Sequence, residues 1–274
     1  MKFCRFKALE RTCYGVVDGS AVVEIKGNPF NRYDLTSVRR PLDRVKLLVP
    51  CVPRTFYAAG LNYLSHIQET AEARGEEVNV PQKPDIGYRA VNALIAHEEP
   101  IVIPKDATQE VQYEGELVAV IGKRAKDVSE EEALDCVLGY TIGNDVSERS
   151  WQRSDRTMWR SKNTDTFKPM GPWIETRVNL ERMRTTVRVN GEVVSEFPTN
   201  NMIFGVATYI STMSRYLTLY PGDVIWMGTD GPTHNIKAGD VVEVEISGIG
   251  TLRNPVIKEE FPDTTQEIQE RNGE

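Results

Sequence analysis

The sequence predicts a β-rich α+β protein, with a small N-terminal β domain followed by a larger domain. Short segments of β-branched and aromatic residues recur along the whole chain, and Gly-containing turn signals separate them. Helical spacing of apolar residues is confined to a few short stretches. Prolines 41, 50 and 53 interrupt the chain between the two parts. We therefore place the boundary near residue 52, giving domains 1–52 and 53–274.

In the first domain, the segments 3–6, 14–17 and 21–25 are rich in β-branched and aromatic residues and predict strands. Asp18-Gly19 lies between two of them and is a hairpin signal, since Gly readily adopts the positive φ that tight turns need.

In the second domain, Leu64, Ile67 and Ala71 have helical spacing and predict a helix over 64–74. Ser129 followed by Glu132 predicts a capping box at the start of another helix. The continuous apolar run 117–121 predicts a buried strand. Residues 57–63 are expected to form a strand that runs into a loop. Further strands are expected at 139–144, 187–194 around an Asn-Gly turn, and 239–249.

Composition excludes several classes of function. The net charge of −7 provides no basic footprint for nucleic acid. The chain has no run of eighteen apolar residues that would predict a transmembrane helix, and its first residues do not resemble a secretory signal. Four scattered cysteines without metal-binding spacing are typical of a reduced cytoplasmic protein. We expect a cytoplasmic protein without a membrane or nucleic-acid partner.

An acidic pair precedes the buried strand at 117–121. Glu114 and Glu116 are two residues apart, so on a strand both carboxylates point to the same face. Two carboxylates that share an apolar setting need a compensating charge, and a hard divalent cation provides it. Gly115 between them would let another group approach the backbone closely. The alternative is an exposed edge with ordinary salt bridges.

A third acid, Asp145, follows the predicted strand at 139–144, where a carboxylate is unexpected unless it is paired or binds metal. Three carboxylates with open positions for water and substrate form a set that Mg²⁺ or Mn²⁺ favours. Together the three acids predict a metal site.

These segments resemble the fumarylacetoacetate hydrolase superfamily, and they occur in the order found in that family. They cover about residues 53 to 255. The matching segments are residues 60–66, 113–117 with 120–123, 139–141 with 144–147, 162 with 165–172, 189–192, 221–223, 228–229 and 248–254.

The resemblance implies a mixed β-sandwich or roll catalytic domain and, for residues 1–52, the small β domain that precedes it in many prokaryotic members. It also implies that Glu114, Glu116 and Asp145 bind Mg²⁺ or Mn²⁺, and that the protein is a homodimer.

Among the three histidines, His66 lies three residues before Glu69 on the predicted helix, a spacing that stacks the two side chains. A carboxylate beside an imidazole raises its basicity, as a general base requires. Short members of the family have a His-x-x-Glu of this kind on a mobile lid that activates water, so the resemblance assigns catalytic roles to His66 and Glu69. The alternative is a solvated helix face. We interpret His97 as a structural turn residue and leave the role of His234 open.

The resemblance implies further roles for polar residues. Lys162 matches a lysine that stabilises a developing enolate or oxyanion, Gln152 a glutamine that hydrogen-bonds substrate, and Thr229 a threonine that meets the substrate carboxylate. Arg89 stands where many relatives have a lysine, and its planar fork binds carboxylates differently. Asp230 replaces the proline of a common Gly-Thr-Pro. These departures concern substrate identity and leave the metal chemistry unchanged.

The sequence therefore predicts an enzyme that acts on a small anionic 2-oxo acid. The leading hypothesis is metal-dependent hydrolysis of a carbon–carbon bond in an acylpyruvate-like β-diketo acid, with His66 and Glu69 activating water. The alternative is decarboxylation or keto–enol tautomerisation of an oxaloacetate-like or hydroxymuconate-like diacid, which uses the same enolate without an attacking water. A metal-dependent binding protein without catalytic activity is a third hypothesis.

Overall fold

The computed structural model describes residues 1–75 and 77–260, and its strands form two large sheets and one short pair. The long sheet contains β1 (Lys2–Ala8), β2 (Arg11–Asp18), β3 (Ala21–Gly27), β4 (Tyr33–Pro41), β5 (Lys46–Leu48), β6 (Phe56–Ala59), β7 (Ile86–Tyr88), β8 (Leu94–Ile95), β11 (Gly115–Ile121), β12 (Val137–Asn144), β14 (Lys168–Glu175) and β17 (Val224–Trp226). The second sheet contains β9 (Ile101–Ile103), β15 (Arg184–Val189), β16 (Glu192–Pro198), β18 (Val241–Ile246) and β19 (Gly250–Lys258). The short pair is β10 (Val111–Gln112) with β13 (Ser147–Glu148).

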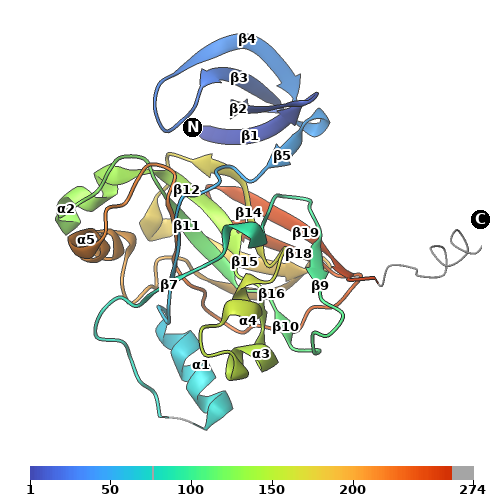
Figure 1. Ribbon diagram of the computed structural model, residues 1–274, viewed down its shortest axis with the longest axis vertical. Coiled ribbons are helices and arrows are strands. Elements are labelled where there is room, and N and C mark those ends of the chain that lie inside the picture. The colour runs from blue at the N-terminus through green and yellow to red at the C-terminus, as the bar shows by residue number, and fades with distance from the viewer. Residues whose placement is uncertain (76, 261–274) are drawn as a thin grey trace, which may run out of the picture.

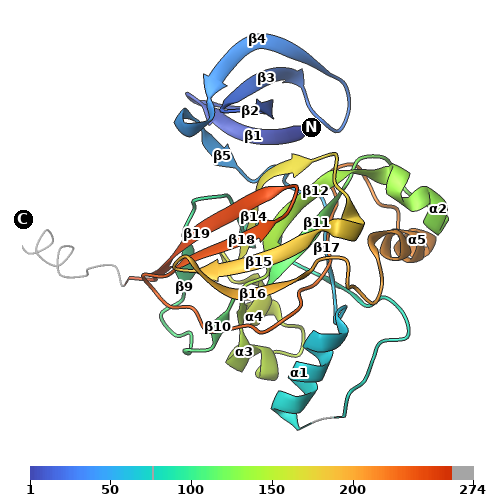
Figure 2. The ribbon, with the colours of Figure 1, turned by 180° about the vertical axis from the view of Figure 1, so that it is seen from behind.

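Helices lie mainly at the end of the molecule opposite the N-terminal strands. They are α1 (Leu64–Arg74), α2 (Glu130–Ala133), α3 (Arg149–Ser154), α4 (Trp159–Asn163) and α5 (Val206–Tyr216), with 3₁₀ turns at Leu42–Arg44, Val91–Ala93, Leu134–Cys136 and Leu180–Arg182. Both views place α1, α3 and α4 together at that end, while α2 packs against α5 at one side (Figures 1 and 2). The helix cluster α1, α3 and α4 borders the candidate site described below.

The N-terminal strands β1 to β4 form an antiparallel meander with its own small core of Cys4, Phe6 and Val22. The predicted turn at Asp18-Gly19 is present, with Gly19 at φ +59°. Strand β1 also pairs with β14 of the larger part, and the N-terminal ammonium lies 2.6 Å from Glu175 Oε1. The two parts therefore share a continuous hydrogen-bonded sheet, so the boundary near residue 52 stays a prediction.

Strand β11 is the centre of the larger part, and all of its residues are buried. It pairs with β12 on one side and with β17 on the other. Leu117 belongs to the core shared with Val187 of the second sheet, whereas Val118 belongs to a different cluster with Trp226. Because both faces are covered, the strand reads in the sequence as a continuous apolar run rather than an alternating one.

Most elements that the sequence predicts are confirmed, namely the strands at 3–6, 14–17, 21–25 and 117–121 and the helix over 64–74. The capping box is also present, since Ser129 Oγ accepts from the Glu132 amide at 3.3 Å and Glu132 Oε2 accepts from the Ser129 amide at 3.2 Å. The elements that the sequence analysis did not predict include β4, β9, α3, α4, β14 and α5.

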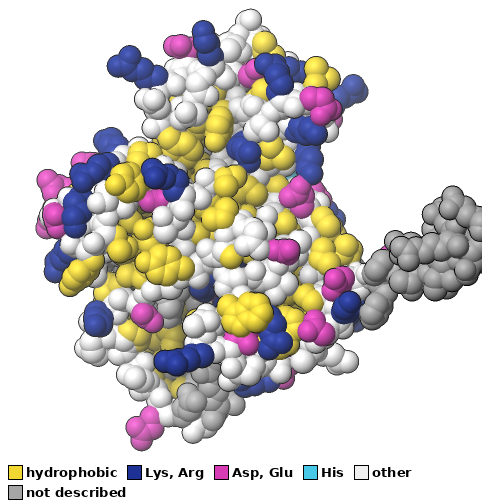
Figure 3. Space-filling view, viewed as in Figure 1, with side chains coloured by type: hydrophobic (Ala, Val, Ile, Leu, Met, Phe, Trp, Pro, Cys, Tyr) yellow, Lys and Arg dark blue, Asp and Glu magenta, His cyan; other side chains and the backbone are white. Residues whose placement is uncertain are grey.

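The surface carries charges of both signs. On the face in Figure 3, Lys and Arg side chains alternate with Asp and Glu, and hydrophobic side chains occur between them. Within the described residues, no helix is long and apolar enough to span a bilayer. The four cysteines are buried and unpaired, and burial raises the pKa of the Cys51 thiol to about 12.

Candidate metal centre and its surroundings

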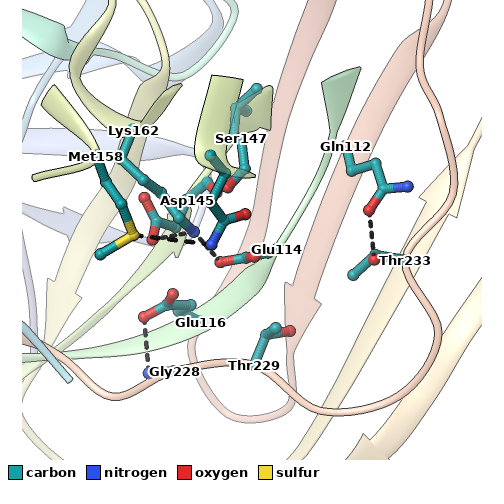
Figure 4. A network of polar contacts seen from close by, with 12 residues as sticks. Gln112, Glu114, Glu116, Asp145, Ser147, Met158, Lys162, Gly228, Thr229 and Thr233 are labelled. Atoms are coloured by element: carbon teal, nitrogen blue, oxygen red, sulfur yellow. Dashed lines mark hydrogen bonds and ion pairs between the residues drawn. The ribbon is translucent and has the colours of Figure 1, made fainter. Parts of the chain in front are cut away.

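Three carboxylates converge where β11 begins and β12 ends. Glu114 immediately precedes β11, Glu116 lies within it, and Asp145 follows β12. The Asp145 amide donates to the Glu114 carbonyl at 2.8 Å, which fixes the two strand ends side by side. One ligand oxygen from each carboxylate lies within 4.8 Å of the others, and all three side chains are buried (Figure 4). The strand geometry predicted for the acidic pair therefore brings all three acids together.

The close approach predicted at Gly115 is present, and the group that approaches is the second sheet. A Cβ at this position would lie 2.9 Å from methyl groups of both Val187 and Val244 in the second sheet. The close approach that requires glycine is therefore sheet-on-sheet packing on the face opposite the carboxylates, and no ligand is needed to account for it.

Four cationic side chains surround two of these acids. Lys162 Nζ lies 2.6 Å from Glu114 Oε2 and 2.8 Å from Asp145 Oδ2, bridging them. Asp145 also contacts Arg89 Nη2 at 2.9 Å and Lys168 Nζ at 2.6 Å. Glu114 Oε1 contacts Arg149 Nη2 at 2.6 Å. Because all of these groups are largely buried, their charges are weakly screened by solvent.

The surrounding charges separate the pKa values of the three carboxyls. Burial alone would raise all three, but Lys162 and Arg149 lower the pKa of Glu114 to about 2. Arg89 and Lys162 likewise hold the pKa of Asp145 well below its usual range. Burial and the charges of the other two acids raise the pKa of Glu116 to about 8. Glu116 is thus the acid with least compensation by cations of the protein.

Glu116 accepts a hydrogen bond from the Gly228 amide at 2.8 Å and makes no ion pair among the described residues. A buried carboxylate without a cationic partner is costly, and a divalent cation at this position would remove that cost. The donors that converge are all carboxylate oxygens, the ligand type that Mg²⁺ and Mn²⁺ prefer. The three acids therefore fit a hard divalent metal ion.

His66 and Glu69 both lie on α1, as predicted, but in different surroundings. His66 is half-buried and close enough to the centre for charges there to act on it: burial lowers the pKa of His66, and Glu114 opposes that effect. Glu69 is exposed. Within the described part of the chain, no hydrogen bond joins His66 to Glu69. The structure thus brings the imidazole, but not the Glu69 carboxylate, towards the acids.

The predicted polar contacts to substrate lie around the same centre. Arg149 Nη1 donates to Gln152 Oε1 at 2.8 Å, so the oxygen of that amide is already engaged, and its NH₂ group donates to Met158 Sδ at 3.7 Å. Thr229 is buried and follows Gly228, the residue that donates to Glu116. Arg89 faces Asp145 through both Nε and Nη2.

Residues that the sequence analysis did not single out complete the site. Lys168 is fully buried and donates to two backbone carbonyls besides contacting Asp145; burial lowers its pKa to about 7. Arg149 connects Glu114, Gln152 and Gln112, the last at 2.8 Å from its Nε. Both residues lie within or next to the motifs that carry the family resemblance. The sequence therefore shows where they occur in the chain, but it does not show which side chains they contact.

The two remaining histidines contact other residues. His97 Nδ1 accepts from the Arg253 amide at 3.1 Å, a structural contact consistent with the expected turn. The ring of His234 makes an edge contact with Tyr113, with ring centroids 6.5 Å apart.

The chain belongs to the fumarylacetoacetate hydrolase superfamily. Residues 55–257 match the family described as Fumarylacetoacetate (FAA) hydrolase C-terminal, and residues 1–50 match the Rv2993c-like, N-terminal family. Protein Rv2993c of Mycobacterium tuberculosis is 38% identical over 275 residues, covering 96% of this chain and 100% of that protein. Oxaloacetate tautomerase fahd2, mitochondrial, of Xenopus laevis is 37% identical over 226 residues, covering 78% of this chain and 69% of that protein.

Solved structures share the whole fold. A 5-carboxymethyl-2-hydroxymuconate delta-isomerase from Mycobacterium smegmatis is 36% identical with a TM-score of 0.85, covering 94% of this chain and 100% of that chain. A maleylpyruvate hydrolase from Sphingobium sp. SYK-6, in complex with manganese(II) ion and pyruvate, is 25% identical with a TM-score of 0.77, covering 95% of this chain and 100% of that chain. The predicted family and the β-rich α+β fold are confirmed, and the family contains isomerases, tautomerases and hydrolases.

Proposed function

We propose that this protein is a divalent-metal-dependent tautomerase that interconverts the keto and enol forms of a small 2-oxo dicarboxylic acid. The observation that carries the proposal is the position of Lys162, whose ammonium group bridges Glu114 and Asp145 beside the uncompensated Glu116. A positive charge held beside a metal site stabilises the negative charge that forms on an enolate oxygen. Both tautomerisation and the hydrolysis predicted from sequence need that enolate.

Two observations favour tautomerisation over hydrolysis. The His66 imidazole approaches the acids without a described hydrogen bond to Glu69, the carboxylate expected to help it activate water. Proton transfer between carbon and oxygen needs a base near the enolate but no activated water. In addition, the relative from Xenopus laevis is an oxaloacetate tautomerase at 37% identity, whereas the maleylpyruvate hydrolase is 25% identical.

The residues would divide the work as follows. A bound Mg²⁺ or Mn²⁺ would be held by the three acids and would polarise the 2-oxo group. His66 removes a proton from the carbon next to that group and returns it in the reverse direction. Lys162 donates a hydrogen bond to the oxygen on which charge develops.

The remaining polar groups bind the ends of the substrate. The NH₂ of Gln152, which has a second N–H besides the one directed at Met158, and the hydroxyl of Thr229 can donate to acceptor oxygens. The guanidinium groups of Arg89 and Arg149 supply positive charge. An excess of cations over carboxylates around the centre favours a dianion over a neutral ligand.

Hydrolysis of an acylpyruvate-like acid is the second candidate. It is favoured by the His-x-x-Glu spacing on α1 and by the manganese-bound hydrolase with a similar fold. A third activity on the same enolate is decarboxylation of oxaloacetate. We also propose a homodimer and a cytoplasmic location, as expected for the family.

The test compares three substrates with purified protein loaded with Mn²⁺. Loss of enol absorbance from freshly dissolved enol-oxaloacetate, faster than without enzyme and without pyruvate release, supports the tautomerase. Pyruvate from oxaloacetate indicates a decarboxylase, and pyruvate plus a carboxylic acid from an acylpyruvate indicates the hydrolase. Glu116→Gln is the matched variant: each activity must fall with it if the acids hold the metal.

A further inference from the structure

The first turn of α1 is tied to the loop that follows β17. Ser65 Oγ donates a hydrogen bond to Asp230 Oδ1, and the Gly231 amide donates to the same oxygen at 2.9 Å. Asp230 is 5% exposed, so this carboxylate lies inside the protein directly beside the residue that precedes His66. Asp230 also occupies a position where the family commonly has proline, whose side chain is uncharged.

The backbone just before this turn is held by other contacts. Asn62 Nδ2 donates to the carbonyls of Phe204 at 3.1 Å and Met227 at 2.9 Å. The Tyr63 hydroxyl donates to the Thr199 carbonyl at 2.7 Å. The start of α1 is therefore fixed to the body of the protein, and the contact between Ser65 and Asp230 adds a further hydrogen bond within its first turn.

Four charged side chains from different parts of the chain influence the pKa of His66. Burial lowers the pKa of its imidazole, Arg149 on α3 and Lys162 on α4 lower it further, and Glu114 before β11 and Asp230 raise it. Glu114 is already engaged by Lys162 and Arg149 and is one of the proposed metal ligands. Asp230 is thus the second carboxylate whose charge raises the pKa of the imidazole.

Glu69, the carboxylate expected from sequence, does not fill this place in the structure. It is exposed to solvent, where its field at His66 is screened. Burial raises the pKa of Glu69, and the charges of Asp230 and Glu72 raise it further. Asp230 therefore acts on Glu69 as a like charge. Of the two carboxylates, Asp230 is the buried one.

We propose that Asp230 is the positioning residue for His66: its buried carboxylate holds Ser65, the residue before His66, and places a negative charge beside the first turn of α1. The proposal rests on the proposed function in so far as His66 is the proton-transfer group. Asp230 acts through His66 and need not touch the substrate. In this chain an aspartate from the 228–234 loop takes the part that a glutamate on the helix takes in the His-x-x-Glu pattern.

The experiment is an NMR titration of the histidine side chains, carried out on the metal-free protein and on the Mg²⁺-loaded protein. The chain has three histidines, so His97→Asn and His234→Asn assign the signals. We expect Asp230→Asn, which keeps an oxygen for Ser65 but removes the charge, to lower the pKa of His66 by roughly 0.5 to 1 unit. We expect Glu69→Gln to move it by less than about 0.2 units, because solvent screens an exposed charge.

The result that overturns the proposal is the reverse order, or an unchanged pKa of His66 in Asp230→Asn. Asp230→Ser is smaller and keeps a hydroxyl for Ser65, so it replaces Asp230→Asn if that variant does not fold; the His97 and His234 signals report folding. In Asp230→Asn, the acidic limb of the pH profile of kcat/KM should move to lower pH by the same amount as the pKa of His66, for whichever reaction the protein catalyses. The titration requires no turnover, so its outcome is independent of whether the protein is a tautomerase.

Discussion

Metal binding should be coupled to the release of a proton from Glu116. Burial and two neighbouring acids raise the pKa of this carboxyl to about 8, so the metal-free protein carries it about nine-tenths protonated at pH 7. Metal ions bind the ionised form, and affinity is therefore lost as the pH falls through the pKa. The apparent Kd for Mn²⁺ should fall about 50-fold between pH 6 and pH 8 and level off above that. Glu114 and Asp145 are already ionised in this range and contribute nothing.

Calorimetry in two buffers with different ionisation enthalpies measures the number of protons released. At pH 7 we expect about 0.9 protons from Glu116 for each ion bound. Lys168, whose pKa burial lowers to about 7, is a second source, so Glu116→Gln is titrated alongside at the higher Mn²⁺ concentrations that a weaker site requires. The difference between the two proteins isolates Glu116. The exposed Glu192→Gln serves as a control for the substitution itself. Equal proton release by wild type and Glu116→Gln, or a Kd independent of pH from 6 to 8, would refute the reasoning.

Three other changes test different parts of the structure. Lys162→Met should lower kcat on the active substrate by roughly 10²- to 10³-fold, because it removes a fixed charge from the enolate, while Mn²⁺ still binds in calorimetry; an unchanged kcat would exclude that role. Gly143→Ala should lower the free energy of unfolding by about 1 to 3 kcal/mol in denaturant titrations, since its Cβ would lie 2.6 Å from the Trp226 ring; Gly205→Ala, with open space at its Cβ, should cost less. Glu175→Gln weakens the contact with the N-terminal ammonium and should cost about 1 kcal/mol with no change in kcat, and a larger effect on kcat than on unfolding would contradict this.

The sequence predicts the fold best where one short stretch contains the whole signal. The helix over 64–74 and the Ser129 capping box depend on neighbours within one turn, and both are confirmed. Helix α5 was missed although Val206, Ile210 and Met213 are buried at helical spacing, because polar residues between them dilute the period. Strand β14 contains two prolines, which normally argue against a central strand.

The same distinction holds for the site: residues within one motif could be predicted, and contacts between distant parts of the chain could not. The acids could be predicted because period-two geometry and the family motif both indicate Glu114 and Glu116. The partners of those acids could not, since each ion pair joins residues 17 to 56 positions apart in the chain: Lys162 with Asp145 is the shorter separation and Arg89 with Asp145 the longer. Asp230 was visible as a departure from the family, but its contact with Ser65 spans 165 positions.

The cations of the site would explain how a protein with a net charge of −7 binds the anionic substrate that we propose. In the metal-free protein Lys162 and Arg149 compensate the buried charge of Glu114. If that carboxylate held a divalent ion, the ammonium and guanidinium groups would lose their principal partner, and their charge would be available to an incoming carboxylate or enolate. Under the proposed function, the same residues would then stabilise the fold in one state and bind substrate in the other. The local field, and not the overall charge, selects the ligand.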